Sequence, residues 1–149
     1  MNAVEIRNLS KNFGPKQAVC GLDMTVPQGA IYGFIGENGS GKSTEKMICG
    51  LIPTSGGSIK LYGKDYTDEN VRAKIGVLIE APGCFPGLSV WDNMMLQAAN
   101  LSIPDAEKEV IKVLKMVRME GAAGNKYKNC SLGMKQRVGI AMALLGNPT

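Results

Sequence analysis

A glycine-rich segment, Gly36-Glu37-Asn38-Gly39-Ser40-Gly41-Lys42-Ser43, limits how this chain can fold more than any other part of its sequence. It directly follows a continuous apolar run at residues 30–35, which is typical of a fully buried parallel strand. A strand, a loop and a helix in this order form the setting that a phosphate-binding loop requires. The pattern predicts an α/β fold with a phosphate site at the loop; the alternative is a tight glycine turn with an exposed lysine.

The residue types in this segment suit the phosphates of a nucleotide. Glycines let successive backbone N–H groups turn inward as a nest, and the N-terminus of the next helix adds the positive end of its dipole. Lys42 is expected to reach the β- and γ-phosphates as a point charge, and Ser43 to offer its hydroxyl to Mg²⁺.

Composition excludes several classes of function. The 149 residues include no histidine, which excludes Ser-His-Asp and Cys-His catalysis and histidine-ligated metals. The net charge of +4 is too modest to predict a nucleic-acid partner. No apolar run could span a bilayer and no secretion signal is visible, so we expect a cytosolic chain unless a partner holds it at a membrane. The four scattered cysteines are expected to be reduced and mostly buried.

Local patterns predict the remaining elements. Alternating residues predict antiparallel strands at 4–9 and 18–26 and a further strand at 58–62, and an apolar run predicts a second buried strand at 75–80. Ser89, three residues before Asp92, predicts a capped helix start, and Pro104 and Asp105 predict another. In the second of these helices, Val110, Val113, Leu114 and Val117 are expected on the core face, and Lys108, Lys112 and Lys115 on the solvated face.

A second motif, Ser131-Leu132-Gly133-Met134-Lys135-Gln136-Arg137, follows the helical part. With the glycine-rich segment, it makes the chain resemble the nucleotide-binding subunit of an ATP-binding-cassette (ABC) transporter over essentially all 149 residues. The resemblance implies a P-loop NTPase (RecA-like) core with N-terminal antiparallel strands and an inserted α-helical subdomain, incomplete at the C-terminus. It divides the chain into a β-rich core part at 1–80, a helical subdomain at 81–130, and the signature motif with its helix at 131–149.

The resemblance also implies cofactors, partners and a location. In the family, Ser131 and Gly133 face the γ-phosphate held by the opposite subunit, so that two copies pair head to tail around two ATP molecules. A transmembrane subunit would hold the pair at the cytoplasmic face of the cell membrane. From the residues alone, Ser131 is also an ordinary N-cap for a helix through Leu145. The expected cofactors are ATP and Mg²⁺, with nucleotide contacts from Phe13, Gly36, Asn38, Gly39, Ser40, Gly41, Lys42, Ser43, Thr44, Ser131 and Gly133, and metal contacts from Ser43 and Glu80.

Two of these positions have open alternatives. Phe13 stands where the family stacks an aromatic ring on adenine, but it is also explained as a buried aromatic at a strand end. Glu80 stands where the family usually has glutamine, beside the metal and the membrane subunit, and it is otherwise a solvated acid. A glutamate followed by a loop like Pro82 to Trp91 resembles the bacterial exporters that protect against peptide antibiotics such as bacitracin and lantibiotics. Phe85 and Trp91 would then lie near the groove for the membrane subunit, although packing within the helical subdomain explains Trp91 nearly as well.

The sequence departs from the family in two respects. No apolar strand ends in Asp-Glu and no histidine follows, so we expect these residues to bind ATP but not hydrolyse it, and to leave a sheet edge uncovered with low stability. The helix after the loop is also one residue short, because seven residues rather than eight separate Lys42 from Gly50. Glu45 takes an apolar or threonine position there. Either the helix end adjusts, or Met47 and Ile48 change faces and the phosphate-binding loop is strained.

Three functions fit these observations. The first is the ATP-binding subunit of an exporter, with antimicrobial peptides or drugs as substrates. The second is a non-hydrolysing nucleotide-binding module that pairs with an intact subunit through Ser131. The third is a soluble cassette protein without a membrane partner, which the loop from Pro82 to Leu88 disfavours.

Overall fold

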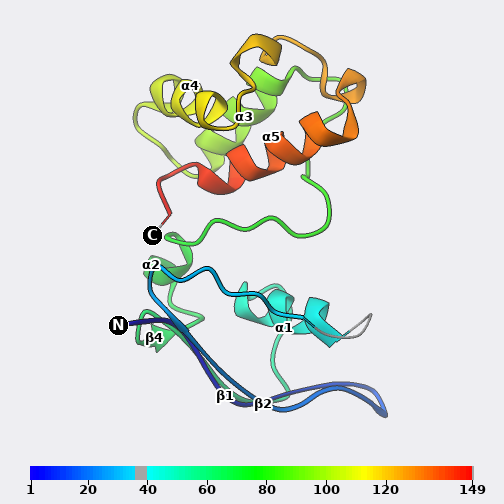
Figure 1. Cartoon of the computed structure of the whole chain (residues 1–149), viewed down its shortest axis with the longest axis vertical. Coiled ribbons are helices and arrows are strands. Elements are labelled where there is room, and N and C mark those ends of the chain that lie inside the picture. The colour runs from blue at the N-terminus through cyan, green and yellow to red at the C-terminus, as the bar shows by residue number, and fades with distance from the viewer. Residues whose placement is uncertain (36–39, 149) are drawn as a thin grey trace. The chain divides into compact units, whose positions relative to one another are not determined.

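The computed structural model describes residues 1–35 and 40–148, with side chains described outside residues 36–42. The chain forms two compact units, Met1–Arg72 and Ala73–Thr149 (Figure 1). Strands and one covering helix make up most of the first unit, whereas the second is helical.

The first unit is built on a four-stranded antiparallel sheet in the order β2-β1-β3-β4. In register, Ile6 of β1 lies opposite Met24 of β2 and Ile59 of β3. The strands are β1 (Asn2–Phe13), β2 (Lys16–Pro27), β3 (Gly56–Leu61) and β4 (Lys64–Asp65). The strands predicted at 4–9, 18–26 and 58–62 are therefore confirmed, with shifted ends.

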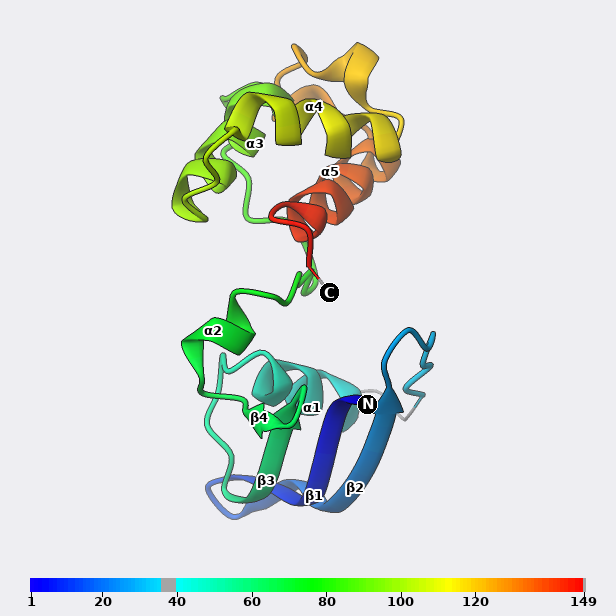
Figure 2. The same cartoon turned by 90° about the vertical axis from the view of Figure 1, so that its left-hand side faces the viewer.

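Helix α1 (Ser40–Ile48) lies along one side of this sheet (Figures 1 and 2). It buries Met47 completely, and Val71 of the short helix α2 (Glu69–Arg72) is also buried. Apolar side chains that are less than a tenth exposed fill this unit: Ile6, Leu9, Val19, Met47, Ile59, Leu61 and Val71. The helix predicted after the glycine-rich segment is thus present and is held by apolar burial against the sheet.

The two predicted parallel strands are wrong for the described residues. The segments 30–35 and 75–80 form no strand, and Ile31 and Ile35 are fully exposed. A buried parallel strand needs a hydrogen-bonding neighbour, and the described part of the chain supplies none to either segment. Both segments are apolar, as their sequences show, but an apolar segment cannot form a strand without a hydrogen-bonding partner.

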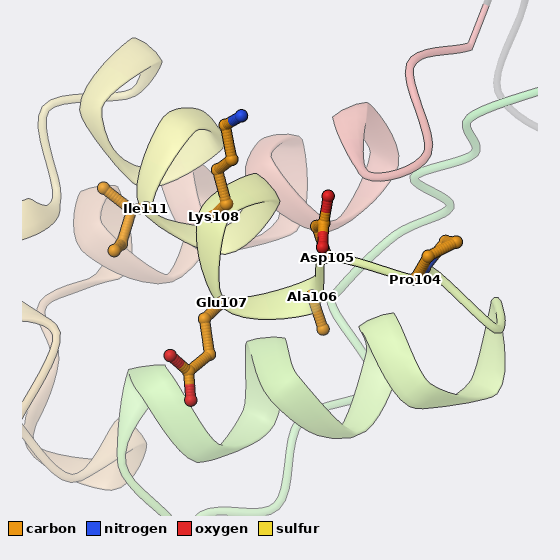
Figure 3. Close-up of a pocket in the computed structure, with 6 residues that line it drawn as sticks. All are labelled: Pro104, Asp105, Ala106, Glu107, Lys108 and Ile111. Carbon is orange, nitrogen blue, oxygen red and sulfur yellow. The ribbon is translucent and has the colours of Figure 1, made fainter.

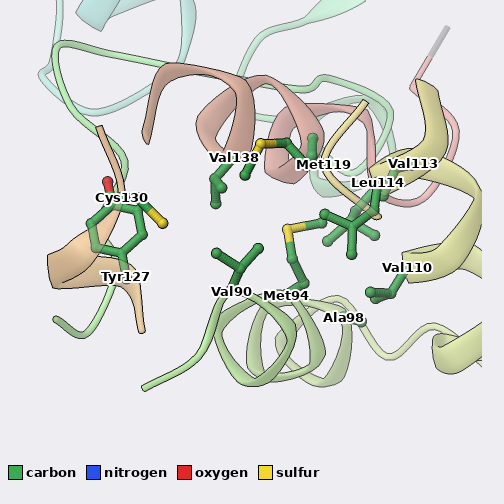
Figure 4. Packing of buried hydrophobic residues seen from close by; sticks show 12 residues of the cluster. Val90, Met94, Ala98, Val110, Val113, Leu114, Met119, Tyr127, Cys130 and Val138 are labelled. Carbon is green, nitrogen blue, oxygen red and sulfur yellow. The ribbon is translucent and has the colours of Figure 1, made fainter. Parts of the chain in front are cut away.

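The second unit packs three main helices around one core (Figure 4). Its elements are α3 (Val90–Asn100), α4 (Ala106–Met116), the short 3-10 helices η1 (Glu120–Ala122) and η2 (Tyr127–Asn129), and α5 (Leu132–Leu144). Core residues come from all three α-helices: Val90, Met94 and Ala98; Val110, Val113 and Leu114; Val138 and Ala141. In α4 the predicted lysine face, Lys108, Lys112 and Lys115, is exposed, and Val117 is half-buried.

Both helix starts predicted in this part are confirmed. Ser89 caps α3 by accepting a hydrogen bond from the Asp92 backbone N–H at 2.9 Å, and Asp92 returns the capping-box contact to Ser89. Asp105 is the N-cap of α4, although its side chain makes no capping hydrogen bond. The expectation of mostly buried cysteines is wrong: Cys130 is buried, Cys49 and Cys84 are half-buried, and Cys20 is exposed. Cys20 follows the buried Val19 on the edge strand β2, so its side chain lies on the opposite, exposed face of the sheet.

Candidate functional site

The predicted phosphate site begins where α1 begins. Gly36, Asn38 and Gly39 lie outside the described residues, as do the side chains of Ser40, Gly41 and Lys42. Ser40 opens the nine-residue helix α1, so the free backbone N–H groups of a helix N-terminus stand at the end of the loop. Such an end attracts anions through its N–H groups and its dipole, which is what the sequence predicted for this point.

Thr44 supplies an observation from the same helix. Its side chain is only 1 % exposed, and its hydroxyl oxygen has no hydrogen-bond partner among the described residues. A buried hydroxyl without a partner costs free energy, and one more hydrogen bond would recover it. Ser43, the predicted Mg²⁺ ligand, is half-buried next to it. A buried unsatisfied hydroxyl beside a helix N-terminus fits a site completed by a polar group such as a nucleotide phosphate.

The helix after the loop, which is one residue shorter than the family pattern, ends in a defined motif. Gly50, with a φ of +67°, closes α1: its N–H donates to Met47 O at 3.0 Å, and the N–H of Leu51 donates to Lys46 O at 2.8 Å. This pair of bonds is a Schellman motif, which stops a helix at a residue in the left-handed region. Met47 remains in the core and Glu45 points to solvent. The effect of the shortening on the phosphate loop and on nucleotide binding stays a prediction.

Phe13 ends β1 beside a buried lysine. Its side chain is 50 % exposed, so burial does not explain the residue. The Lys11 ammonium lies over its ring, 5.1 Å from the ring centroid. Lys11 is itself 8 % exposed and donates to the backbone carbonyl of Pro53 at 2.6 Å.

Ser131 occupies the N-cap of α5, as predicted. Its hydroxyl accepts a hydrogen bond from the Met134 N–H at 3.3 Å, and the helix continues to Leu144 with Leu145 as C-cap. Ser131 and Gly133 are both exposed, and a Cβ added to Gly133 would meet nothing within 4 Å. The structure thus shows the capping role and leaves the hydroxyl and the Gly133 backbone accessible at a helix N-terminus.

Glu80 lies in the second unit, in an exposed bend with a φ of +61°. A non-glycine residue in this left-handed region costs on the order of 1 kcal/mol. The segment around it packs against α5: a Cβ added to Gly139 would lie 2.7 Å from Leu78 and 2.6 Å from Pro82. The strand predicted to end in Glu80 is not formed. The segment that was predicted to form it nevertheless packs against helix α5, which begins at the motif that starts with Ser131.

A buried asparagine holds the loop that follows Glu80. Asn93 of α3 is 2 % exposed; its side-chain oxygen accepts from the Phe85 N–H at 2.7 Å, and its side-chain nitrogen donates to Phe85 O at 3.1 Å and Ser89 O at 2.9 Å. Phe85 and Leu88 are exposed on this loop, at 57 % and 40 %. Trp91, in contrast, packs against the helical core. The three hydrogen bonds of Asn93 therefore hold the loop in a defined backbone conformation with the Phe85 side chain exposed to solvent.

A cluster of sulfur and aromatic groups lies behind this loop. The Cys84 thiol donates to Met142 Sδ at 3.7 Å, and the Lys135 ammonium lies 5.5 Å from the centroid of the Tyr127 ring. Burial, then the nearby Cys84, raises the pKa of Tyr127 to about 12. Burial likewise raises the pKa of the Cys84 thiol. The Tyr127 hydroxyl and the Cys84 thiol are therefore neutral at physiological pH, and they belong to the packing of the helical unit.

An open hollow lies at the start of α4 (Figure 3). Its wall is formed by Pro104, Asp105, Ala106, Glu107, Lys108 and Ile111. None of the predicted site residues lines it. Among the described residues there is no group of three or more histidine, cysteine or acidic residues placed to hold a metal ion. No helix in the described part of the chain is long and apolar enough to cross a bilayer.

The sequence analysis missed two residues, Lys11 and Asn93. Lys11 and Phe13 are two apart on one strand, a spacing that places side chains on the same face and that pointed to their contact. Asn93 stands among the buried positions of α3, where a polar residue signals a specific partner. The sequence therefore indicated that Lys11 and Asn93 are special positions. It did not identify their partners, Pro53 and Phe85, because these lie in loops whose path the sequence does not define.

Known proteins resemble this chain along nearly all of its length. The sequence profile of the ABC transporter family matches residues 19–149. The lantibiotic transport ATP-binding protein SrtF of Streptococcus pyogenes is 36% identical over 146 residues, covering 97% of this chain and 62% of that protein. The bacitracin transport ATP-binding protein BcrA of Enterococcus faecalis is 36% identical over 149 residues, covering 97% of this chain and 48% of that protein. The chain thus spans roughly half of these relatives.

A solved structure shows the same fold. The structure of cbiO1 from Clostridium perfringens, part of the ABC transporter complex cbiONQ, matches 99% of this chain and 62% of its own with a TM-score of 0.84 at 28% identity. The predicted α/β fold class, with N-terminal antiparallel strands and a helical subdomain, is therefore confirmed, although the two parallel strands are not formed.

Proposed function

Because the chain belongs to the ABC transporter family, we propose that it is the ATP-binding part of a transporter subunit and that the segment from Gly36 to Thr44 binds ATP with Mg²⁺. The observation that carries this proposal is the buried Thr44 hydroxyl, which has no partner among the described residues and lies in the first turns of α1, directly after the glycine-rich segment. A phosphate oxygen at the helix N-terminus is the kind of group that would satisfy such a site.

The roles of the other residues follow from their chemistry. Lys42 would neutralise the phosphates and Ser43 would hold Mg²⁺, with Glu80 as a further metal contact. Phe13, exposed at the end of β1, would stack on the adenine base. In the complete transporter, hydrolysis of the γ-phosphate would provide the free energy for transport, whereas the residues of this chain are proposed to bind ATP rather than to hydrolyse it. The exposed Ser131 and Gly133 at the start of α5 would contact the nucleotide of a second nucleotide-binding subunit.

We infer an exporter as the complete assembly. SrtF is named for lantibiotic transport and BcrA for bacitracin transport, and both resemble this chain over 97% of its length. The loop held by Asn93 presents Phe85 and Leu88 as exposed apolar side chains, which suits a contact with a transmembrane subunit at the cytoplasmic face of the membrane. Peptide antibiotics are accordingly the proposed cargo.

The decisive test is nucleotide binding. Titration calorimetry with MgATP should give saturable binding to the unaltered chain, and Lys42→Ala should weaken it about 10- to 100-fold because a charge-assisted contact to phosphate is lost. Lys46→Ala, which removes a lysine one turn further along α1, is the matched control and should retain binding. Absence of binding, or equal behaviour of the two variants, would refute the proposal.

A further inference from the structure

The least expected charge in the first unit is the ammonium of Lys11. The side chain is 8 % exposed, and a buried ammonium is costly unless it is paired. Its interactions in the structure are a 2.6 Å hydrogen bond to the carbonyl of Pro53 and a position 5.1 Å from the centroid of the Phe13 ring. A cation within about 6 Å of an aromatic centroid is attracted to the ring face. Lys11 therefore joins the loop after α1 to the aromatic ring at the end of β1.

The loop that holds Lys11 is itself fixed to the same strand. The N–H of Asn12 donates to the Ser55 hydroxyl at 3.0 Å, and the N–H of Ser55 donates to Ser10 O at 2.9 Å. These two bonds flank Lys11 in sequence, so the carbonyl of Pro53 has a defined position relative to β1. The ammonium is thus held at one point, and through it the ring of Phe13 is held as well.

Phe13 nevertheless keeps half of its surface exposed. One face of the ring attracts the Lys11 ammonium, and the exposed remainder is accessible to a planar partner. Immobilising a side chain on binding costs conformational entropy, and a ring that is oriented in advance avoids that cost.

We propose that Lys11 is a positioning residue, which holds the Phe13 ring as a preformed platform for the adenine base; this inference rests on the proposed ATP-binding function. Lys11 does not act on the phosphates, because it is buried and its ammonium donates to Pro53 O. Its contribution is therefore specific to the base, and it is transmitted through Phe13.

The test compares two probes by titration calorimetry: MgATP, which has a base, and Mg-tripolyphosphate, which has none. Lys11→Met keeps the length of the side chain but removes the charge, and it should weaken ATP binding about two- to tenfold while leaving tripolyphosphate binding unchanged. Lys11→Arg retains a cation and should restore most of the affinity for ATP. Lys60→Met, which removes an exposed lysine of β3, is the control and should alter neither.

Two further variants separate positioning from a general effect on folding. In a Phe13→Leu background, Lys11→Met should cause no additional loss, because the residue acts through the ring. Lys11→Gln keeps a donor for Pro53 O without a charge, so it should reproduce the loss even where Lys11→Met folds poorly.

Each other outcome overturns the inference. An unchanged affinity of Lys11→Met and Lys11→Gln for ATP contradicts it, and so does an equal loss for ATP and tripolyphosphate, which would indicate a contact with phosphate. If the unaltered chain binds tripolyphosphate as tightly as ATP, the base adds no affinity. The proposed adenine platform is then refuted, whereas the proposed phosphate site is supported. If the unaltered chain binds neither probe, the ATP-binding function is refuted together with it.

Discussion

Replacing Asn93 by alanine should weaken the helical unit more than any exposed substitution in α3. The asparagine side chain makes three hydrogen bonds to backbone groups, at 2.7, 3.1 and 2.9 Å. Two of the backbone partners keep another bond: Phe85 O accepts from the Leu88 N–H at 3.2 Å, and Ser89 O accepts from the Asn93 N–H at 3.1 Å. The N–H of Phe85 has no other hydrogen-bond acceptor among the described residues, so losing the Asn93 oxygen leaves this N–H unpaired and accounts for most of the lost free energy.

The magnitude follows from these bonds. An orphaned backbone N–H costs about 1–3 kcal/mol, and each of the two lost bonds to carbonyls that keep a partner costs about 0.5 kcal/mol. The sum is about 2–4 kcal/mol. Asn100→Ala, at the exposed end of the same helix, is the matched control and should change the free energy of unfolding by less than about 0.5 kcal/mol.

Urea unfolding followed by tryptophan fluorescence measures this directly. Trp91 is the single tryptophan of the chain, lies two residues from Asn93 and packs on the helical core. At a typical slope, a loss of about 2–4 kcal/mol lowers the urea midpoint on the order of 1–2 M. A midpoint for Asn93→Ala that matches that of Asn100→Ala would show that the three bonds do not hold the loop.

Three further predictions concern the helical unit. Ser131→Ala removes the N-cap of α5 and should lower stability by about 1 kcal/mol, measured by urea unfolding, whereas Ser131→Asp should retain it. Gly139→Ala should cost about 1–3 kcal/mol in the same assay, because its Cβ would overlap Leu78 and Pro82, whereas Gly133→Ala has open space and should be neutral or stabilising. Because the pKa of Tyr127 is raised to about 12, the unfolded chain loses this proton near pH 10 before the folded one does, so stability should fall as pH rises from about 10 to 12. Tyr127→Phe should remove that part of the pH dependence, and a tyrosinate absorbance titration of the folded chain in which Tyr127→Phe removes absorbance that forms near pH 10, rather than near pH 12, would contradict it.

Features that depend on a few adjacent residues were predictable from the sequence. The capping box of Ser89 and Asp92, the N-cap Ser131 and the apolar face of α4 all appear as expected. Each is determined by hydrogen bonds or side-chain spacing within one or two helical turns, so the local sequence is sufficient. The β1–β2 hairpin is likewise determined by two neighbouring segments and a short turn.

Features that depend on distant partners were not predictable in this way. The apolar run at 30–35 predicted a strand, but a strand exists only with a hydrogen-bonding neighbour, and Ile31 and Ile35 are instead exposed. The contact between Lys11 and Pro53 spans 42 positions in sequence and requires the path of a loop. The phosphate-binding loop was predicted from the order and spacing of its residues. Among the described residues, only helix α1 and the buried Thr44 hydroxyl provide structural evidence about it.

Within the described part of the chain, the buried polar side chains are those of Lys11, Thr44 and Asn93. Each lies at a place where the proposed function needs a fixed geometry: beside the aromatic ring, in the helix that follows the phosphate loop, and under the loop that presents Phe85. An apolar residue of similar size would fill these positions at lower cost, because burying a polar group is unfavourable unless it gains a partner. Lys11 and Asn93 have partners in backbone groups of loops, so they fix loops rather than the core. Thr44 has none among the described residues, and by the same reasoning the phosphate proposed for the loop would be its partner.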